Sequence, residues 1–391
     1  MALTINSGLV DDQDILSNER VIDMSDVIDT LESDFSQFST ALMKVRSKPA
    51  NSSKVEWLED RLFPRKSALA ASATSAASSI DVTTGEGVYF NVGDVVRNTL
   101  TGEAYEVTGV TTDAVGITRS IGSVAAASSA SANAELIIVA NASPQGARAP
   151  SAKVVERVAA YNYTQIVRHS YSFTRTLTQS NLYTGGEPGY ERKKKAVEHK
   201  RALEAMLFLG ARDLDTSGQG GNEPSGFCGG AIEYISTNIH DAAGTMAASS
   251  WEGFMETDLQ YGSQNKVMFA APRVSRVLSS YPLTAWTRAT PQNAIWGVKV
   301  DGFISGAFGY EVPVFVKREW GEFSKGTAGQ MGSKAFLIDM DAVRWRPLQS
   351  TVLLRNRQDN DADRVTEEYL TEASLEFQHE AKHSLLINVT G

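Results

Sequence analysis

The chain has 391 residues, of which 42% are hydrophobic and 21% charged, as in a globular protein and unlike a disordered one. No apolar run approaches the roughly 18 residues of a membrane helix, and we expect no secretory signal, because residues 1–12 lack a basic segment followed by an apolar one. Cys228 is the only cysteine, which excludes an internal disulfide. The net charge of −9 argues against a nucleic-acid binder that works by overall attraction.

The charge is unevenly distributed along the chain. Residues 1–40 contain one base, Arg20, and nine acids, which are Asp11, Asp12, Asp14, Glu19, Asp23, Asp26, Asp29, Glu32 and Asp34. Residues 145–180 have the opposite sign, with Glu156 against the five bases Arg148, Lys153, Arg157, Arg168 and Arg175. Patches of opposite sign on one chain favour contact between copies, although two separate solvated faces would give the same pattern.

A helix is predicted to follow the acidic start. Ser25 is suited to be its N-cap, with Asp26 and Asp29 in the first turn, and Pro49 ends the pattern. The apolar residues at helical spacing are Val27, Ile28, Leu31, Phe35, Phe38, Leu42 and Val45. The helix would be about 30 Å long. Its apolar stripe must pack on the body of its own chain or on a neighbouring chain.

The composition of the chain changes twice after this helix. Residues 69–80 are rich in Ala and Ser and are predicted to be a linker. Residues 81–142 contain short β-type runs separated by turn signals such as Thr101-Gly102 and Thr112-Asp113. This pattern predicts a small β-barrel or sandwich inserted into a larger domain.

Apolar and polar residues alternate from Tyr161 to Leu177. A strand of this length would extend about 55 Å, whereas ordinary strands have about five or six residues. We therefore expect it to project from its domain and to need a partner chain. Residues 189–212 are compatible with a long helix, whose early lysines would contact nucleic acid or face solvent. Residues 231–334 indicate a mixed α/β domain.

One motif suggests an enzyme. His379-Glu380-Ala381-Lys382-His383 matches the His-Glu-x-x-His pattern of zinc peptidases, which requires a helix. The alternation from Tyr369 to Val389 predicts a strand instead, in which the two histidines would lie about 13 Å apart. One zinc ion, with bonds of about 2 Å, cannot bridge them. We expect no catalytic residue, metal or cofactor, and a zinc peptidase is kept only as an alternative.

Several short sequence motifs occur in an order and spacing that resemble those of a known family. They are Phe90-Asn91-Val92-Gly93-Asp94-Val95-Val96-Arg97, Thr101-Gly102-Glu103, Asn162-Tyr163-Thr164-Gln165-Ile166, Ala202-Leu203-Glu204-Ala205-Met206-Leu207 and Pro224-Ser225-Gly226-Phe227. Over roughly residues 85–391, the chain resembles the major capsid proteins of tailed bacteriophages with the Hong Kong 97 fold, in the SU-ten-like branch. The first eighty residues carry little of this resemblance.

The resemblance implies an α+β fold of the Hong Kong 97 type. Its parts would be an N-terminal arm at 1–54, an extended loop region at 55–183 with a β-rich insertion at about 81–142, a peripheral domain at 184–214 and 335–391 with a spine helix and long strands, and an axial domain at 215–334. Some members lock their shells by a Lys–Asn isopeptide bond. No lysine occurs between Lys66 and Lys153, so we expect no such crosslink.

The function implied by the resemblance is assembly of a virion shell. Hexamers and pentamers would form an icosahedral head around double-stranded DNA, in the host cytoplasm. Expected partners are further copies, a portal protein, scaffold and decoration proteins and non-specifically contacted DNA, with no membrane. A nanocompartment shell of the same fold, or a tail or host-attachment protein carrying the β-rich insertion as a binding module, would be alternatives.

Eight residues are candidates for contacts between subunits. They are Asp11, Asp26, Asp34, Phe35, Arg148, Arg157, Arg168 and Arg175. We expect the acidic arm from Asp11 to Asp34 to lie against the basic hairpin of an adjacent copy.

Overall fold

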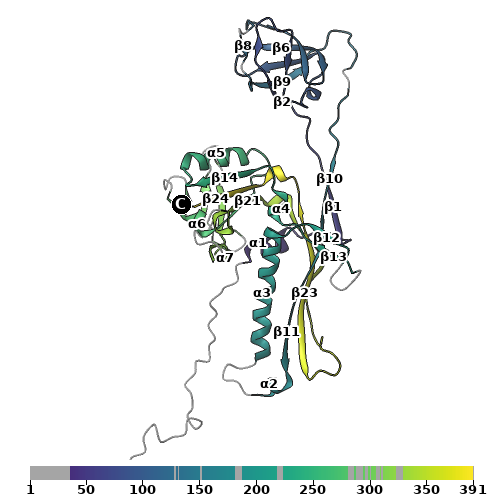
Figure 1. Ribbon diagram of the computed structural model, residues 1–391, viewed down its shortest axis with the longest axis vertical. Coiled ribbons are helices and arrows are strands. Elements are labelled where there is room, and N and C mark those ends of the chain that lie inside the picture. Colours follow the sequence, from purple (N-terminus) through teal and green to yellow (C-terminus); the bar gives the residue numbers. More distant parts are fainter. Residues whose placement is uncertain are drawn as a thin grey trace, which may run out of the picture. The chain divides into compact units, whose positions relative to one another are not determined.

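The computed structural model describes residues 36–126, 129–130, 132–149, 152–180, 187–217, 223–280, 286–287, 294–295, 298–299, 301–304, 309, 311–322 and 329–390. The chain divides into two compact units, which Figure 1 shows with their helices and strands. Unit 1 comprises Met1–Trp57 and Ala160–Gly391, and unit 2 comprises Leu58–Ala159. Helices and sheets both contribute to unit 1, so the predicted α+β class is confirmed.

Unit 2 is built on a six-stranded antiparallel sheet with the order β2-β9-β5-β6-β7-β4. Its strands are β2 (Lys66–Ala68), β4 (Ser79–Asp81), β5 (Asp94–Asn98), β6 (Ala104–Thr111), β7 (Ala114–Thr118) and β9 (Glu135–Asn141), beside the short pair β3 (Ala73–Thr74) and β8 (Ser129–Ala130) and the 3-10 turn η1 (Gly87–Tyr89). Alternate residues such as Val96, Tyr105 and Val115 form a separate core. Unit 2 is therefore rich in β-strands.

The prediction of a linker at 69–80 was wrong. This Ala/Ser-rich segment contains β3 and β4, and Leu69 and Ile80 are buried in the core of unit 2. Backbone pairing needs no particular side chain, so two large apolar residues suffice to anchor strands whose other side chains are small. The Ala/Ser-rich composition of this segment concealed its strands.

The larger sheet of unit 1 has seven strands in the order β14-β24-β21-β15-β20-β19-β16. They are β14 (Ile239–Gly244), β24 (Ser384–Val389), β21 (Ala335–Asp339), β15 (Lys266–Ala270), β20 (Glu311–Val316), β19 (Asp301–Ile304) and β16 (Trp286–Thr287). All five residues of β15 and of β21 are buried, as expected for strands that are covered on both faces. The helices of this region are α4 (Ala231–Tyr234), α5 (Ala248–Asp258), α6 (Pro272–Ser279) and α7 (Glu319–Glu322).

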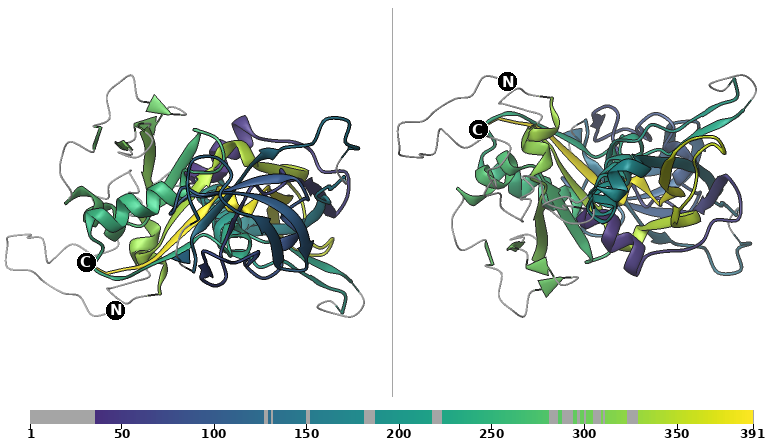
Figure 2. Two further views of the ribbon diagram at one scale, coloured as in Figure 1. Left: turned by 90° about the horizontal axis from the view of Figure 1, so that it is seen from above. Right: turned by 90° about the horizontal axis from the view of Figure 1, so that it is seen from below.

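A second sheet of unit 1, here called the long sheet, has the order β11-β23-β22. It consists of β11 (Gln165–Thr174), β23 (Arg364–Phe377) and β22 (Val343–Leu354). The helix α3 (Glu187–Leu209) runs along β11 and β23 (Figure 1 and Figure 2). This confirms the long helix that was predicted at 189–212.

The expected strand from Tyr161 to Leu177 is shorter than predicted and is paired within its own chain. The chain forms β10 (Val158–Tyr163), which pairs with β1 (Lys54–Glu59), then β11, and then α2 (Arg175–Gln179). All ten residues of β11 pair with β23 in antiparallel register, from Gln165 opposite Ala373 to Thr174 opposite Arg364. The expectation that this segment needs a partner chain was therefore wrong for the edge of β11 that pairs with β23.

The strand predicted from Tyr369 to Val389 is also interrupted. The strand β23 ends at Phe377, the 3-10 turn η5 (Glu380–Lys382) follows, and β24 belongs to the seven-stranded sheet. His379 adopts a positive φ of 52° directly before this turn. The polar and apolar alternation continues through the turn and gave no sign of it.

The helix predicted to start at Ser25 is described only from Ser36, as α1 (Gln37–Val45). Phe38 and Leu42 are fully buried in the core of unit 1, so this part packs on its own chain. The rest of the predicted helix lies outside the described residues. The remaining short elements are β12 (Asp213–Asp215), β13 (Ser225–Phe227), β17 (Ala294–Ile295), β18 (Val298–Lys299), η3 (Met331–Ser333) and η4 (Met340–Ala342).

Candidate functional site

Half of the eight predicted contact residues can be placed. Asp11, Asp26, Asp34 and Phe35 lie outside the described residues. Arg148 is exposed after β9, Arg157 directly precedes β10, Arg168 lies on β11 and Arg175 begins α2. The acidic arm lies outside the described residues, so its pairing with these arginines stays a prediction.

Three of these arginines already contact a carboxylate of their own chain. Arg168 forms two hydrogen bonds with Glu368 on β23, at 2.5 and 2.9 Å. Hydrogen bonding from Arg168 lowers the pKa of Glu368 below its usual value. The other two pairs are Arg157 with Asp60 at 3.3 Å and Arg175 with Asp363 at 3.2 Å. An acidic arm that bound these arginines would compete with acids of the same chain.

The start of α3 is tied to the long sheet by a buried carboxylate. Arg192 on α3 donates to both oxygens of Glu367 on β23, at 2.8 Å from Nη2. Tyr171 on β11 donates its hydroxyl to the same carboxylate. Burial, and then the hydrogen bond to Glu367, raise the pKa of Tyr171 to about 12. This cluster fixes the orientation of helix and sheet and has no nucleophile or general base near neutral pH.

A second buried carboxylate joins the end of α3 to α1. Glu204 accepts backbone N–H groups of Phe38 at 3.0 Å and Ser39 at 2.6 Å, which are the second and third residues of α1. It therefore caps that helix, whose first N–H groups lack partners within the helix. Lys317, which follows β20, forms an ion pair with the same carboxylate, and both side chains are almost fully buried. An acid inside an apolar helical stretch was the sequence signal for this contact, and the sequence analysis missed it.

Asn162 connects three segments where β10 meets β11. Its Oδ1 accepts from the backbone N–H of Gly229 at 2.8 Å, and its Nδ2 donates to the carbonyls of Gly229 at 3.0 Å and Leu375 at 2.7 Å. The adjacent Cys228 is fully buried, which raises the pKa of its thiol to about 11. A protonated, buried thiol is not a nucleophile, so this site is structural.

The His-Glu-x-x-His segment forms neither a strand nor an α-helix, so the reason given for rejecting zinc was wrong. His383 is fully buried, and its Nδ1 accepts the backbone N–H of Asp339 at 3.1 Å. Its Nε2 lies 3.2 Å from the carbonyl oxygen of Gln378, to which it donates. Burial lowers the pKa of His383 to about 3. Both ring nitrogens are thus occupied, and His383 offers no lone pair to a metal.

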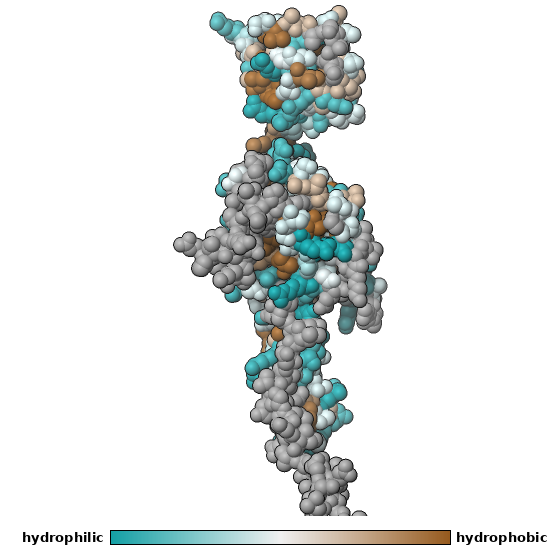
Figure 3. Space-filling model, turned by 90° about the vertical axis from the view of Figure 1, so that its left-hand side faces the viewer, coloured by the Kyte–Doolittle hydropathy of each residue, from teal (hydrophilic) through white to brown (hydrophobic). Residues whose placement is uncertain are grey.

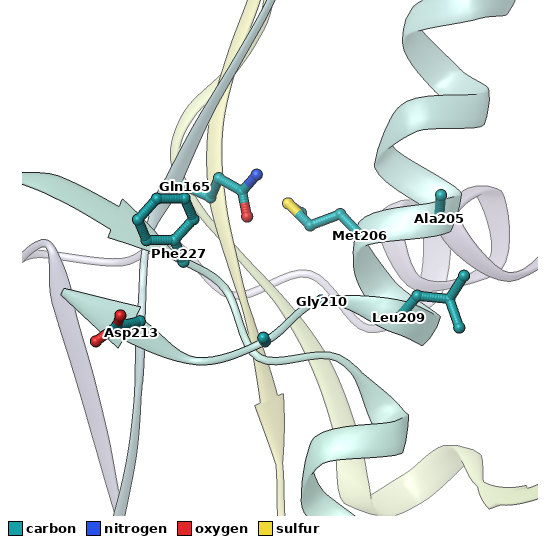
Figure 4. A pocket seen from close by; sticks show the side chains of 8 residues that line it. Gln165, Ala205, Met206, Leu209, Gly210, Asp213 and Phe227 are labelled. Atoms are coloured by element: carbon teal, nitrogen blue, oxygen red, sulfur yellow. The ribbon is translucent and has the colours of Figure 1, made fainter. Parts of the chain in front are cut away.

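Two cavities among the described residues are lined mainly by apolar surface. One of about 380 Å³ lies between the end of α3, the start of β11 and the β12–β13 hairpin. Figure 4 shows Met206 and Gln165 pointing toward one another across it, with Phe227 on the far side. A second, of about 700 Å³, lies within unit 2 and is lined by Arg61, Phe63, Pro64, Val88, Tyr89, Val110, Thr112, Lys153, Val154 and Val155. Neither gathers the groups that catalysis would need.

Unit 2 also exposes large apolar side chains. Leu62 is 93% exposed and Val154 is 86% exposed. Figure 3 shows apolar residues scattered among polar ones on the visible surface of this unit.

Within the described part of the chain, no group of three or more His, Cys, Asp or Glu side chains could hold a metal ion. No helix described here is long and apolar enough to cross a membrane.

The described residues combine buried ion pairs, a long paired sheet and exposed apolar side chains. The model of the SU10 major capsid protein family matches residues 4–390. The chain therefore belongs to the SU10 major capsid protein family. The resemblance that was stated from the sequence is confirmed by this match.

Individual relatives are distant. The major capsid protein of Pseudomonas phage PaMx41 is 25% identical over 198 residues, which are 50% of this chain and 47% of that protein. The chain thus spans about half the length of the curated relative that it matches. Among solved structures, the capsid of Myoviridae phage XM1 is 9% identical, with a TM-score of 0.47 and coverage of 98% of this chain and 100% of that one. The SrpI encapsulin of Synechococcus elongatus PCC 7942 is 9% identical, with a TM-score of 0.43 and coverage of 60% and 78%. The family assignment rests on the sequence match.

Proposed function

We propose that this capsid protein assembles into hexamers and pentamers that close an icosahedral head around double-stranded DNA. The observation that carries the proposal is the match of the family model over residues 4–390. Contacts between subunits can each be weak, because once neighbours are fixed every further contact is effectively intramolecular. Closure then makes the shell stable as a whole.

The outer edge of β11 offers one surface for such contacts. This strand is at the edge of the long sheet, and within the described residues Ile166–Thr174 form no backbone hydrogen bond to a strand other than β23. A free strand edge can pair with another chain. Ile166 is 57% exposed there. We expect a neighbouring subunit to cover this edge.

The parts of the chain are proposed to have the roles expected from the family. Residues 1–54 would be an N-terminal arm, 55–183 an extended loop region with the β-rich insertion, 184–214 and 335–391 a peripheral domain, and 215–334 an axial domain. The shell would form in the host cytoplasm. It would join a portal protein and use scaffold and decoration proteins, with DNA contacted non-specifically.

Electron microscopy of the purified full-length chain, alone and with candidate scaffold proteins of the same phage, tests this proposal. We expect closed particles tens of nanometres wide. A nanocompartment shell would also form closed particles, but heads from a phage lysate would contain nuclease-resistant DNA only if the chain encloses the genome. Monomers or small rings under all of these conditions would refute assembly and favour the attachment-protein alternative.

The pairing of the acidic arm with the basic hairpin gives a separate prediction. Arg157→Glu and Arg168→Glu should reduce the yield of particles, and more so at low salt, because screening weakens the interaction of exposed charges at high salt. Light scattering across a salt series measures this yield. Arg97→Glu, at an exposed position on β5, is the control.

Each reversal also disrupts a pair within the chain, so swapped variants are needed. Arg157→Glu with Asp60→Arg, and Arg168→Glu with Glu368→Arg, restore the in-chain pairs with opposite polarity. If the arm binds these arginines, the swaps will still impair assembly. Recovery of normal assembly in both swaps would assign the effect to the in-chain pairs and rule out binding of the acidic arm to these arginines.

A further inference from the structure

A row of four hydrogen-bonding side chains crosses from β11 through α3 to β22. Nδ1 of His169 on β11 lies 3.0 Å from Nδ1 of His199 on α3. Nε2 of His199 lies 2.7 Å from Oγ1 of Thr371 on β23, which lies 2.8 Å from Oγ1 of Thr351 on β22. The middle of α3 is therefore joined to all three strands of the long sheet through His199.

The number of protons that this row can hold is limited. With both imidazoles neutral, one Nδ1 donates to the other, and the hydroxyl groups rotate to complete the row. One added proton is also accommodated: His169 then carries hydrogen on both nitrogens and donates to Nδ1 of His199, whose Nε2 donates to Thr371. A second proton places two N–H groups and two positive charges against each other at 3.0 Å. The rings must then separate.

The surroundings make the second proton costly. His199 is 1% exposed and Thr371 is fully buried. The ring of Tyr369 on β23 stacks on His199 at 6.0 Å. On α3, Lys195 and Glu198 form an ion pair with each other at 2.5 Å. Burial has the largest effect on the pKa of His169 and lowers it, whereas the charge of Glu198 raises this pKa and that of Lys195 lowers it.

No carboxylate in the described residues has a hydrogen bond to either ring, and the nearby Glu367 is held by Arg192 and Tyr171. Burial lowers the pKa of His169 and, with the charge of His169, lowers that of His199 to about 4.

We propose that the contact between His169 and His199 is a latch that holds the middle of α3 on the long sheet and is released by acid. The helix remains attached on either side of the latch, by Arg192 to Glu367 and by Glu204 to Lys317. Release therefore loosens the middle of α3 and does not detach the helix. This proposal does not depend on shell formation, because all of its groups belong to one chain.

The direction of the pH dependence follows from the lowered pKa values. In the released or unfolded state the two histidines titrate near their usual value of about 6.5, so that state binds more protons between pH 6.5 and 4. The stabilisation is complete above pH 6.5 and is lost progressively as the pH falls toward the folded-state pKa of His199, about 4.

Hydrogen exchange on the unassembled full-length chain tests the latch, with rates corrected for the intrinsic effect of pH. We expect the protection of residues 195–203 to fall about tenfold or more between pH 7 and pH 4.5, since one pKa unit corresponds to a factor of ten. In His199→Gln, whose amide can hydrogen-bond to both neighbours without titrating, protection should not change with pH. His379→Asn, which removes the histidine directly before the η5 turn and tolerates its positive φ, should behave as the unaltered chain does.

An equal loss of protection in the unaltered chain and in His199→Gln would overturn the proposal. A second measurement covers the case in which the variant does not fold. The chain has five histidines, so their ring signals can be followed by NMR in the unaltered protein. We expect His169 to titrate first and His199 only near pH 4. A pKa of His199 near 6.5 with α3 still protected would equally overturn the latch.

Discussion

Replacing Glu204 by alanine is expected to lower the free energy of unfolding of unit 1 by about 3–5 kcal/mol, the usual cost of removing one partner of a buried ion pair. Lys317 would keep its charge at a position where its side chain is 1% exposed, and the N–H groups of Phe38 and Ser39 would lose their acceptor. The end of α3 would then no longer hold the start of α1. This is the largest single effect that we expect from one side chain.

Urea unfolding followed by tryptophan fluorescence measures this effect on the correct unit, because all six tryptophans lie outside residues 58–159. Glu204→Met combined with Lys317→Met removes both charges together and should cost clearly less than Glu204→Ala alone. Lys317→Met alone leaves Glu204 with its two backbone donors and should be intermediate. A Glu204→Ala variant as stable as the unaltered chain would show that the buried pair is not needed.

Gly210→Ala should destabilise unit 1 by about 3 kcal/mol, because an added methyl group has no room at this position. Gly210 directly follows α3, and a Cβ atom there would lie 2.1 Å from the carbonyl oxygen of Cys228 and 2.6 Å from that of Met206. Both obstacles are backbone atoms, which cannot rotate away. The loop that contains Gly229 and holds Asn162 would have to move.

Gly189→Ala is the matched control at the other end of the same helix. A Cβ atom there would meet nothing within 4 Å, and alanine has the better helix propensity. We expect a gain of about 0.5 kcal/mol. Thermal unfolding monitored by tryptophan fluorescence would compare the two variants. If both shifted the transition in the same direction, close packing at Gly210 would not explain its effect.

The sequence predicted those elements whose pattern directly reflects burial. The alternation around His169 and Tyr171 identified a strand, and the apolar end of the segment at 189–212 identified α3. The resemblance to the capsid family was visible from short sequence motifs in the right order, and the family model confirms it. The sequence also indicated the acidic arm and the basic segment, but not whether they meet.

The tertiary structure decided which groups become partners. Arg168 and Glu368 are 200 residues apart, and nothing local to either residue indicates that β11 lies beside β23. For the same reason, the acid Glu204 stands out in its apolar stretch without indicating Lys317 as its partner, and the row through His199 was not expected. A local pattern records whether a side chain faces core or solvent, because that preference belongs to the residue itself. Hydrogen bonds and ion pairs between distant segments depend on how the chain returns to itself, so only the folded chain determines them.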